Sequence, residues 1–160
     1  MTFSQLLHAV RQNPQEMVIP SVWGQGRAGF GGLAVALVFE AMRAKVPAGR
    51  PLRSLAVTLD APVSFEAEVL REGKAVSQVL GRAVQNGQVV TLVQGSFGAS
   101  RASAIDVPAL PAPAMKPVAE CQELPYIKNV TPEFTRYLAM RWGEGGMPFS
   151  NNQSRHMGGW

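Results

Sequence analysis

Apolar residues dominate one long stretch in the first third of the chain. From Leu33 to Met42 the single polar residue is Glu40, and no helix breaker occurs before Pro47. A helix that is apolar on nearly every side is typically buried on most of its surface. About ten apolar residues are too few to cross a bilayer, which takes about 20. The pattern therefore predicts a buried helix over residues 33–45, which other elements must enclose.

A shorter amphipathic helix is predicted before this stretch, over residues 3–11. Its apolar side chains follow the i, i+3, i+4, i+7 spacing of one helix face: Phe3, Leu6, Leu7 and Val10. Between the two helices, residues 17–20 are apolar and end in a proline. Because proline cannot donate to a strand ladder, this segment predicts a short edge strand.

After residue 51 the pattern changes to the period of two that is typical of strands. Apolar residues alternate with small or polar ones over residues 55–59 and 65–69. Glu72-Gly73 and Asn86-Gly87 predict hairpin turns that lead into strands at 75–84 and 88–97. A sheet with one apolar face and an apolar helix should pack together. We therefore expect an α+β fold, in which a curled antiparallel sheet wraps one long helix.

The last third of the chain has a different composition. Five prolines lie between residues 107 and 125, and such a run predicts an extended linker. Alternation over residues 134–142 then predicts a strand that has no sheet of its own to join. We expect a first domain at residues 1–100 and a linker at 101–125. Residues 126–160 would begin an incomplete second domain or pair with another chain.

Composition narrows the function classes. The 15 basic and 11 acidic residues are scattered along the chain, which argues against a nucleic-acid partner but suits a small anion such as a nucleotide-bearing thioester. The single Cys121 excludes an intramolecular disulfide and a cysteine-built zinc site, and we expect it to be an exposed linker thiol. The first residues have neither a basic segment nor a long apolar run, so we expect no signal peptide, no membrane span and a cytoplasmic location.

Five glycines precede the long helix, at positions 24, 26, 29, 31 and 32. Their spacing fits G-x-G-x-x-G, but no long strand precedes it and no βαβ unit follows, so we reject a dinucleotide site and expect no cofactor and no metal. The first amides of a helix lack intrahelical acceptors and lie at the positive end of its dipole. The amides of Phe30, Gly31 and Gly32 could therefore hold a developing oxyanion. Alternatively, the glycines simply permit close packing.

These features together resemble the N-terminal half of the acyl-CoA thioesterase II family, a group of double-hotdog proteins. The resemblance covers residues 23–99 and begins with Gln-Gly-Arg-Ala-Gly-Phe-Gly-Gly-Leu before the helix. The matching segments are residues 25–33, 52–55, 60–62, 68–74, 85–87 and 95–99. It implies a hotdog fold, in which strands curl round a central helix. The proline-rich run and residues 141–160 then resemble the approach to a second hotdog.

The resemblance implies an enzyme that hydrolyses fatty acyl-CoA to free acid and CoA. In this family an acid before the helix, a hydroxyl residue and a glutamine at a strand turn form the catalytic network, usually in the second hotdog. Gln85 falls at the glutamine position, Ser54 loosely matches the hydroxyl, and the acid position falls near Gly29, which cannot ionise. The resemblance therefore implies that a second hotdog, or a partner in a homo-oligomer, completes the site.

Three polar residues have both a catalytic and a structural interpretation. Glu40 is the only ionisable residue in the apolar part of the helix, and some hotdog thioesterases use a carboxylate there; otherwise it pairs with Arg43 at i+3. Asp60 is either an acid or the first residue of a turn before Pro62. Gln85 is either catalytic or a polar residue expected beside a hairpin turn.

Two other functions stay open on the sequence. The glycine at the acid position also suits a non-catalytic module that binds acyl-CoA or assembles with other chains. A hotdog hydratase would need an Asp–His pair near the helix, whereas His8 and His156 lie far from it in the sequence.

Overall fold

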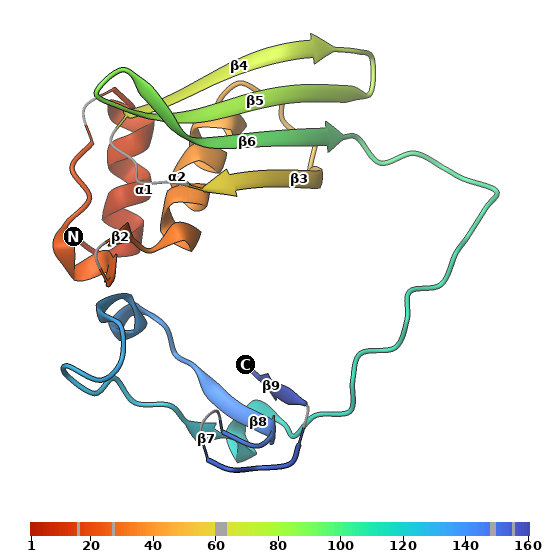
Figure 1. The fold of residues 1–160 in the computed structure, drawn as a ribbon. Coiled ribbons are helices and arrows are strands. Elements are labelled where there is room, and N and C mark those ends of the chain that lie inside the picture. Colours follow the sequence, from red (N-terminus) through yellow and green to blue (C-terminus); the bar gives the residue numbers. More distant parts are fainter. Residues whose placement is uncertain (16, 27, 60–63, 148–149, 155) are drawn as a thin grey trace. The chain divides into compact units, whose positions relative to one another are not determined.

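Two helices and a four-stranded sheet form the first of two units into which the chain divides, Met1–Ala102 and Ser103–Trp160 (Figure 1). The computed structural model describes residues 1–15, 17–26, 28–59, 64–147, 150–154 and 156–160. The first unit contains α1 (Phe3–Gln12), a 3-10 turn η1 (Ser21–Trp23), β1 (Gly24–Gln25), β2 (Ala28–Gly29), α2 (Gly31–Arg43), β3 (Leu52–Leu59), β4 (Ser64–Glu72), β5 (Val76–Gln85) and β6 (Gln88–Gly98).

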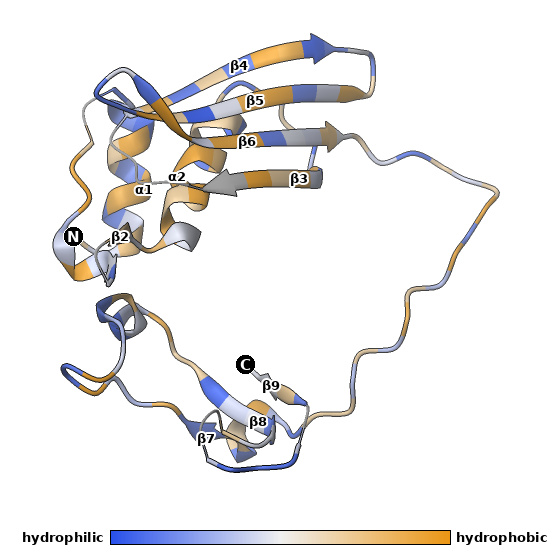
Figure 2. Ribbon diagram, viewed as in Figure 1, coloured by the Kyte–Doolittle hydropathy of each residue, from blue (hydrophilic) through white to orange (hydrophobic). Residues whose placement is uncertain are grey.

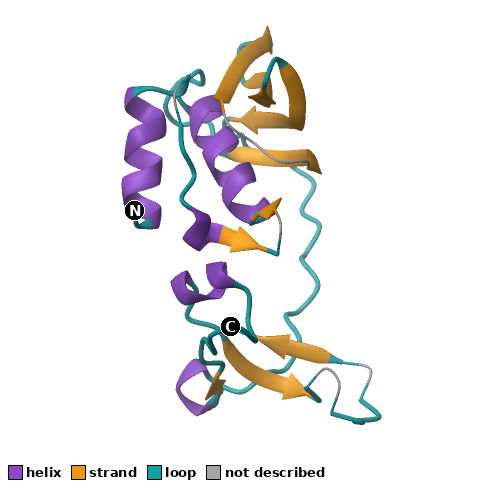
Figure 3. Cartoon of the chain, turned by 60° about the vertical axis from the view of Figure 1, so that its left-hand side comes forward, coloured by secondary structure: helices purple, strands orange, loops and turns teal. Residues whose placement is uncertain are grey.

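The first helix, α1, confirms the amphipathic pattern. Thr2 caps it by accepting a hydrogen bond from the Gln5 amide, while the Gln5 side chain accepts one from the Thr2 amide. Its apolar face packs against α2, and Figure 3 shows the two helices side by side. The edge strand expected at residues 17–20 is wrong. Met17 is buried there without joining a ladder, and the chain turns at Pro20 into η1 instead.

The second helix, α2, begins and ends two residues earlier than the sequence predicts. It is apolar along most of its length, in contrast to α1 (Figure 2). One face is buried, through Leu33, Ala34, Leu37, Val38 and Met42. Val35 and Phe39 on another face are only half-buried. The expected burial on most sides is therefore correct for one face of the helix and wrong for the other.

The sheet has the strand order β3-β6-β5-β4, and all its neighbours are antiparallel. Asn86 and Gly87 both have positive φ, 50° and 77°, as the tight turn between β5 and β6 requires. The helix α2 packs against β4, β5 and β6, whose inward side chains form the core: Phe65, Val79, Ala83, Val93 and Phe97. The expected α+β architecture, with a helix on a four-stranded antiparallel sheet, is confirmed.

Two glycines in the sheet allow the helix to approach closely. A Cβ on Gly81 would overlap Val38 and lie 2.8 Å from the Met42 sulfur. A Cβ on Gly95 would lie 2.8 Å from the terminal methyl of Met42. Neighbouring strands therefore offer a bare backbone surface on which α2 is seated.

The second unit has little regular structure. It consists of an extended run, η2 (Val118–Glu120), β7 (Gln122–Glu123), η3 (Glu133–Tyr137), β8 (Arg141–Gly145) and β9 (Met157–Gly159). The expected strand at 134–142 is wrong, because a 3-10 turn follows Pro132 and the Thr135 hydroxyl donates back to the Pro132 carbonyl at 2.7 Å. The strand that does form, β8, pairs with both β7 and β9, so it does not lack a sheet.

Cys121 lies in this second unit and is buried, not exposed as the sequence suggests. Its thiol lies 3.3 Å from the Pro117 carbonyl, and a Cβ on Gly143 would approach its sulfur to 3.2 Å. Met115 lies closer still to such a Cβ, at 2.9 Å, so the glycine in β8 makes room for both sulfur-containing side chains. That residues 126–160 begin a second hotdog stays a prediction.

A substitution at one of the two sheet glycines, Gly81 and Gly95, tests the packing of α2 against the sheet. Gly81→Ala should lower the free energy of unfolding by about 1–3 kcal/mol, because the new methyl group overpacks the contact with Val38 and Met42. Urea unfolding followed by circular dichroism measures the loss.

Gly73→Ala is the matched control for this substitution. A Cβ there meets only the Val76 carbonyl at an ordinary 3.5 Å, so we expect a change within about 0.5 kcal/mol. Equal losses in the two variants would contradict a close approach of helix and sheet.

Candidate functional site

The N-terminus of α2 presents two backbone amides that donate to no other described residue. Phe30 is the N-cap, and its own amide donates to the Trp23 carbonyl at 2.8 Å. Its carbonyl accepts from the amides of Leu33 and Ala34 at 3.0 and 3.3 Å. Among the described residues, nothing accepts from the amides of Gly31 and Gly32. Of the three amides expected as oxyanion donors, the structure thus leaves two available.

The Phe30 side chain explains why position 32 is a glycine. A Cβ there would lie 2.5 Å from the tip of the Phe30 ring, so the ring rests on the first turn of the helix. Gly32 itself is exposed. Both interpretations of the glycines are therefore compatible with the geometry, since the same glycine permits close packing and keeps its amide at the surface.

Glu40 is held by the other helix. Its carboxylate accepts from Arg11 Nε of α1 at 2.6 Å, and its side chain is 13% exposed. The expected partner at i+3, Arg43, is wrong, because the helix turns Glu40 toward α1. Glu40 also lines a cavity of about 340 Å³ between α1, α2 and β4, together with Lys45 and Glu66. The carboxylate is therefore engaged in an ion pair.

The residues that match the family network are spread over separate elements. Gln85 ends β5 opposite Gln88 and is half-buried, and its side chain bonds no other described residue. Ser54 is exposed on β3 opposite Ser96, and Gly29 is exposed in β2. Asp60 lies outside the described residues. In the described part of this unit, no hydrogen bond joins these positions.

An uncovered apolar face lies beside α2, and the sequence analysis did not find it. Leu55 and Val57 of β3 share the inner face of the sheet with Gly95 and Val93, yet Val57 is 40% exposed. Because β3 ends the sheet order, its outer edge also lacks a neighbouring strand among the described residues. The half-buried Val35 and Phe39 add to this surface, which we call the α2–β3 face. Strand alternation alone predicts which side chains point inward, but not that Val57 stays 40% exposed among the described residues.

A second cavity, of about 420 Å³, lies at the C-terminal end of α2. Its lining includes four large apolar residues, Phe39, Val46, Leu52 and Phe97, and two arginines, Arg43 and Arg50. Sequence reasoning also missed this cavity. The available signal was the segment at residues 47–51, in which two prolines enclose a glycine and an arginine.

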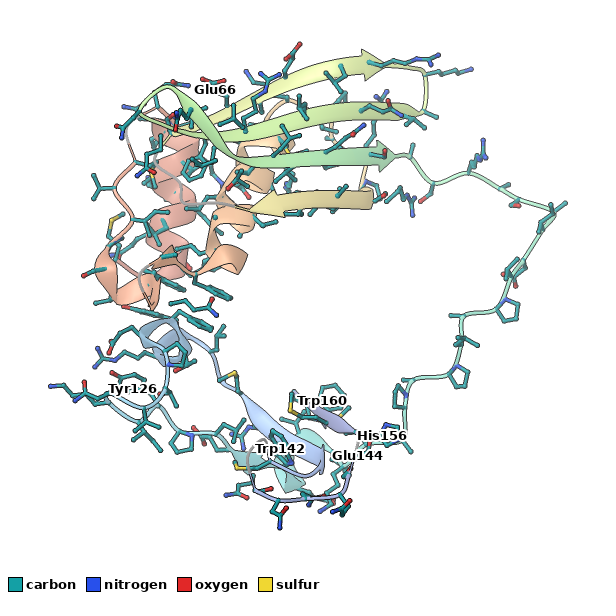
Figure 4. The ribbon with its side chains drawn as sticks, viewed as in Figure 1. Glu66, Tyr126, Trp142, Glu144, His156 and Trp160 are labelled. Atoms are coloured by element: carbon teal, nitrogen blue, oxygen red, sulfur yellow. The ribbon has the colours of Figure 1, made fainter. Side chains whose placement is uncertain are left out.

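In the second unit, the polar contacts around η3 join residues close in the sequence. The Tyr126 hydroxyl donates to the Glu133 carboxylate at 2.5 Å, and this hydrogen bond raises the pKa of Tyr126 above its ordinary value. Arg136 lies over the same ring, 4.6 Å from its centroid. Figure 4 shows Trp142, Glu144, His156 and Trp160 around the β8–β9 pair, away from Tyr126. These contacts fix the chain around η3.

Metal and membrane sites find no support in the part of the chain that the structure describes. No three His, Cys, Asp or Glu side chains lie there as a cluster that could hold a metal ion. Nor does that part contain a helix with the length and apolar character needed to span a bilayer.

Comparison with known proteins identifies relatives of the first unit. The family profile described as acyl-CoA thioesterase N-terminal domain matches residues 19–98, which is half of the chain. A hot dog fold protein of unknown function from Alicyclobacillus acidocaldarius superposes with a TM-score of 0.65 at 22% identity, over 80% of this chain and 49% of its own. A candidate thioesterase II from Thermobifida fusca YX superposes with a TM-score of 0.62 at 16% identity, over 85% of this chain and 53% of its own.

A candidate thioesterase from Novosphingobium aromaticivorans DSM 12444 gives a TM-score of 0.53 at 22% identity, over 85% of this chain and 54% of its own. None of the curated protein sequences matches the chain. The hotdog fold expected from the sequence is thus confirmed. The chain spans about half the length of these three structures.

Two variants of the Arg11–Glu40 pair distinguish an ion pair from a catalytic group. If Glu40 only joins the helices, Glu40→Gln and Arg11→Gln should each lower the free energy of unfolding, with a coupling of up to about 1 kcal/mol in a double-mutant cycle. In any assay of catalysis both variants should then keep kcat within about threefold of the parent, a change of under 1 kcal/mol in the barrier.

Arg82→Gln serves as the control, because it breaks the more exposed pair with Glu68 at 3.4 Å. We expect a smaller loss of stability there. A loss of activity in Glu40→Gln that Arg11→Gln does not share would show that Glu40 takes part in the chemistry.

Proposed function

Since the chain belongs to the acyl-CoA thioesterase family through the N-terminal domain at residues 19–98, we propose that it is the first half of an enzyme that hydrolyses fatty acyl-CoA to free fatty acid and CoA. The observation that carries this proposal is the pair of unengaged amides at Gly31 and Gly32. Hydrolysis of a thioester builds negative charge on the carbonyl oxygen. Fixed backbone donors at the positive end of a helix stabilise that charge before it develops.

The acyl chain would lie along the α2–β3 face, which starts close to these amides. For the acyl chain this face offers Val35, Leu55 and Val57, and burying a hydrocarbon chain against them would remove apolar surface on both sides from water. A second hotdog, from the same longer chain or from another copy, would cover the face and close the slot. The outer edge of β3, which pairs with no other described strand, gives such a partner a strand with which to extend the sheet.

The group that activates water would come from that second hotdog. Gly29 carries no side chain, and Glu40 is engaged with Arg11. Gln85 would orient the water or the substrate once the partner brings its own polar groups to the slot. We therefore propose that residues 1–160 alone bind the substrate but do not hydrolyse it at an appreciable rate.

A non-catalytic acyl-CoA-binding module is the second candidate function. The glycine at the acid position favours it, as does the ion pair that occupies Glu40. The two proposals differ in one result, since only the enzyme releases free CoA from octanoyl-CoA or palmitoyl-CoA when the full-length protein is present.

One substitution tests the role of the helix amides. Gly31→Pro removes an N–H at the first helical position, where proline is well tolerated, and the extended φ and ψ of Phe30, −62° and 117°, suit a residue before proline. We expect kcat of the full-length protein to fall by about 10²–10³-fold, as for the loss of one oxyanion donor. A thiol-release assay with octanoyl-CoA measures it.

Gly31→Ala is the matched control, because it adds a Cβ at the same place but keeps the amide. It should retain most of the activity. Equal activity in the proline and alanine variants would rule out this amide as an oxyanion donor.

A further inference from the structure

The 420 Å³ cavity at the C-terminal end of α2 is lined by two arginines, Arg43 and Arg50, which we call its rim, and by large apolar residues, which we call its floor. We propose that it binds the phosphorylated nucleotide of a CoA thioester, with Arg43 and Arg50 holding phosphate oxygens and Phe39 receiving the base. The inference rests on the proposed function, because only an acyl-CoA substrate makes this nucleotide that of CoA. It assigns the nucleotide end of that substrate to residues at the opposite end of α2 from the proposed oxyanion donors.

Arg50 supplies a positive charge that the protein compensates poorly. Its side chain is only 13% exposed, and its guanidinium donates to two neutral oxygens, Ser77 Oγ at 2.5 Å and the Lys74 carbonyl at 3.2 Å. The carboxylate of Glu72 lies 4.0 Å away and is itself half exposed. A largely buried charge is costly unless an opposite charge approaches it. A phosphate group in the cavity would provide that charge.

Arg43 supplies a second guanidinium, which is not engaged by any other described residue. It ends α2, is exposed, and bonds no other described residue. An arginine fork matches two oxygens of one phosphate better than a lysine ammonium does. Two such forks on one rim suit a ligand with more than one phosphate.

The loop that carries Arg50 is preformed. Pro47 and Pro51 restrict its backbone, and Gly49 between them has a φ of 79°, which other residues rarely adopt. The hydrogen bonds of Arg50 tie this loop to β5 and to the β4–β5 hairpin. The rim therefore needs little ordering when a ligand binds, which reduces the cost of binding.

The floor of the cavity offers a ring on which a base can stack. Phe39 and Phe97 lie nearly parallel, with centroids 6.0 Å apart and an angle of 11° between the rings. Phe97 is buried, whereas Phe39 is half-buried and so has ring surface to offer. Stacking of a base on an aromatic ring contributes without regard to base identity, so the phosphates would supply the selectivity.

The length of α2 links this cavity to the proposed oxyanion donors. The helix is 13 residues long, about 20 Å at 1.5 Å per residue. An extended phosphopantetheine arm has a comparable reach. A CoA thioester with its carbonyl at Gly31 and Gly32 could thus place its phosphates at Arg43.

Arg43→Gln and Lys45→Gln form a matched pair of variants. Both remove one positive charge at the same end of α2, but Lys45 lines the other cavity, beside Glu40. In the full-length protein, calorimetry should show the Kd for adenosine 3′,5′-bisphosphate and for CoA rising about tenfold in Arg43→Gln, the loss expected for one charge-assisted contact. Lys45→Gln should leave both values unchanged.

Three results would overturn the inference: an unchanged Kd in Arg43→Gln, an equal rise in Lys45→Gln, or ATP binding as tightly as adenosine 3′,5′-bisphosphate. Hydrolysis of octanoyl-CoA with the same KM in Arg43→Gln as in the parent would also refute it while leaving the proposed function intact. Conversely, Arg43-dependent binding of CoA without any hydrolysis would support the nucleotide site and contradict the proposed enzyme.

Discussion

The close approach of α2 to the inner face of the sheet is the contact on which the rest of the first unit depends. Gly81 and Gly95 leave backbone where neighbouring positions have side chains, and Val38 and Met42 fill that space. A helix this apolar has to bury its surface, and the glycines decide which face is buried and how deeply. The orientation of every other group on α2 follows from that choice.

With Val38 and Met42 against the sheet, the remaining groups of α2 separate by role. Glu40 turns toward α1 and forms an ion pair with Arg11, while Val35 and Phe39 belong to the uncovered α2–β3 face. The unengaged amides lie at one end of the helix and the arginine-rimmed cavity at the other. One helix thus connects a proposed site for the thioester carbonyl with a proposed site for its nucleotide.

The sequence predicted the elements of the first unit well because local signals and packing agree there. The capped spacing of α1, the apolar run of α2 and the turn at Asn86-Gly87 each specify structure within a few residues. The strand predicted at residues 134–142 was wrong because its alternating pattern is short. A local hydrogen bond from the Thr135 hydroxyl to the Pro132 carbonyl favours a 3-10 turn there instead. The partner of Glu40 was missed because an i+3 neighbour is visible in sequence, whereas Arg11 approaches only after two helices pack.

The candidate site was predictable only where it is made of backbone. Glycines at the start of a helix indicate accessible amides, so the sequence predicted Gly31 and Gly32 as donors. It could not predict that the Phe30 amide donates to the Trp23 carbonyl, because that hydrogen bond depends on the conformation of the preceding loop. The arginine-rimmed cavity is lined by residues from α2, β3, β6 and the loop at 47–51. Their proximity arises only from the tertiary fold, so no spacing in the sequence predicts it.

The central claim is that the amides of Gly31 and Gly32 meet the thioester carbonyl. Amide chemical shifts of the full-length protein, recorded with and without a non-hydrolysable acyl-CoA analogue, test it most directly. The account predicts that the Gly31 and Gly32 resonances shift as the analogue saturates the protein. Saturation with both resonances unmoved would contradict it.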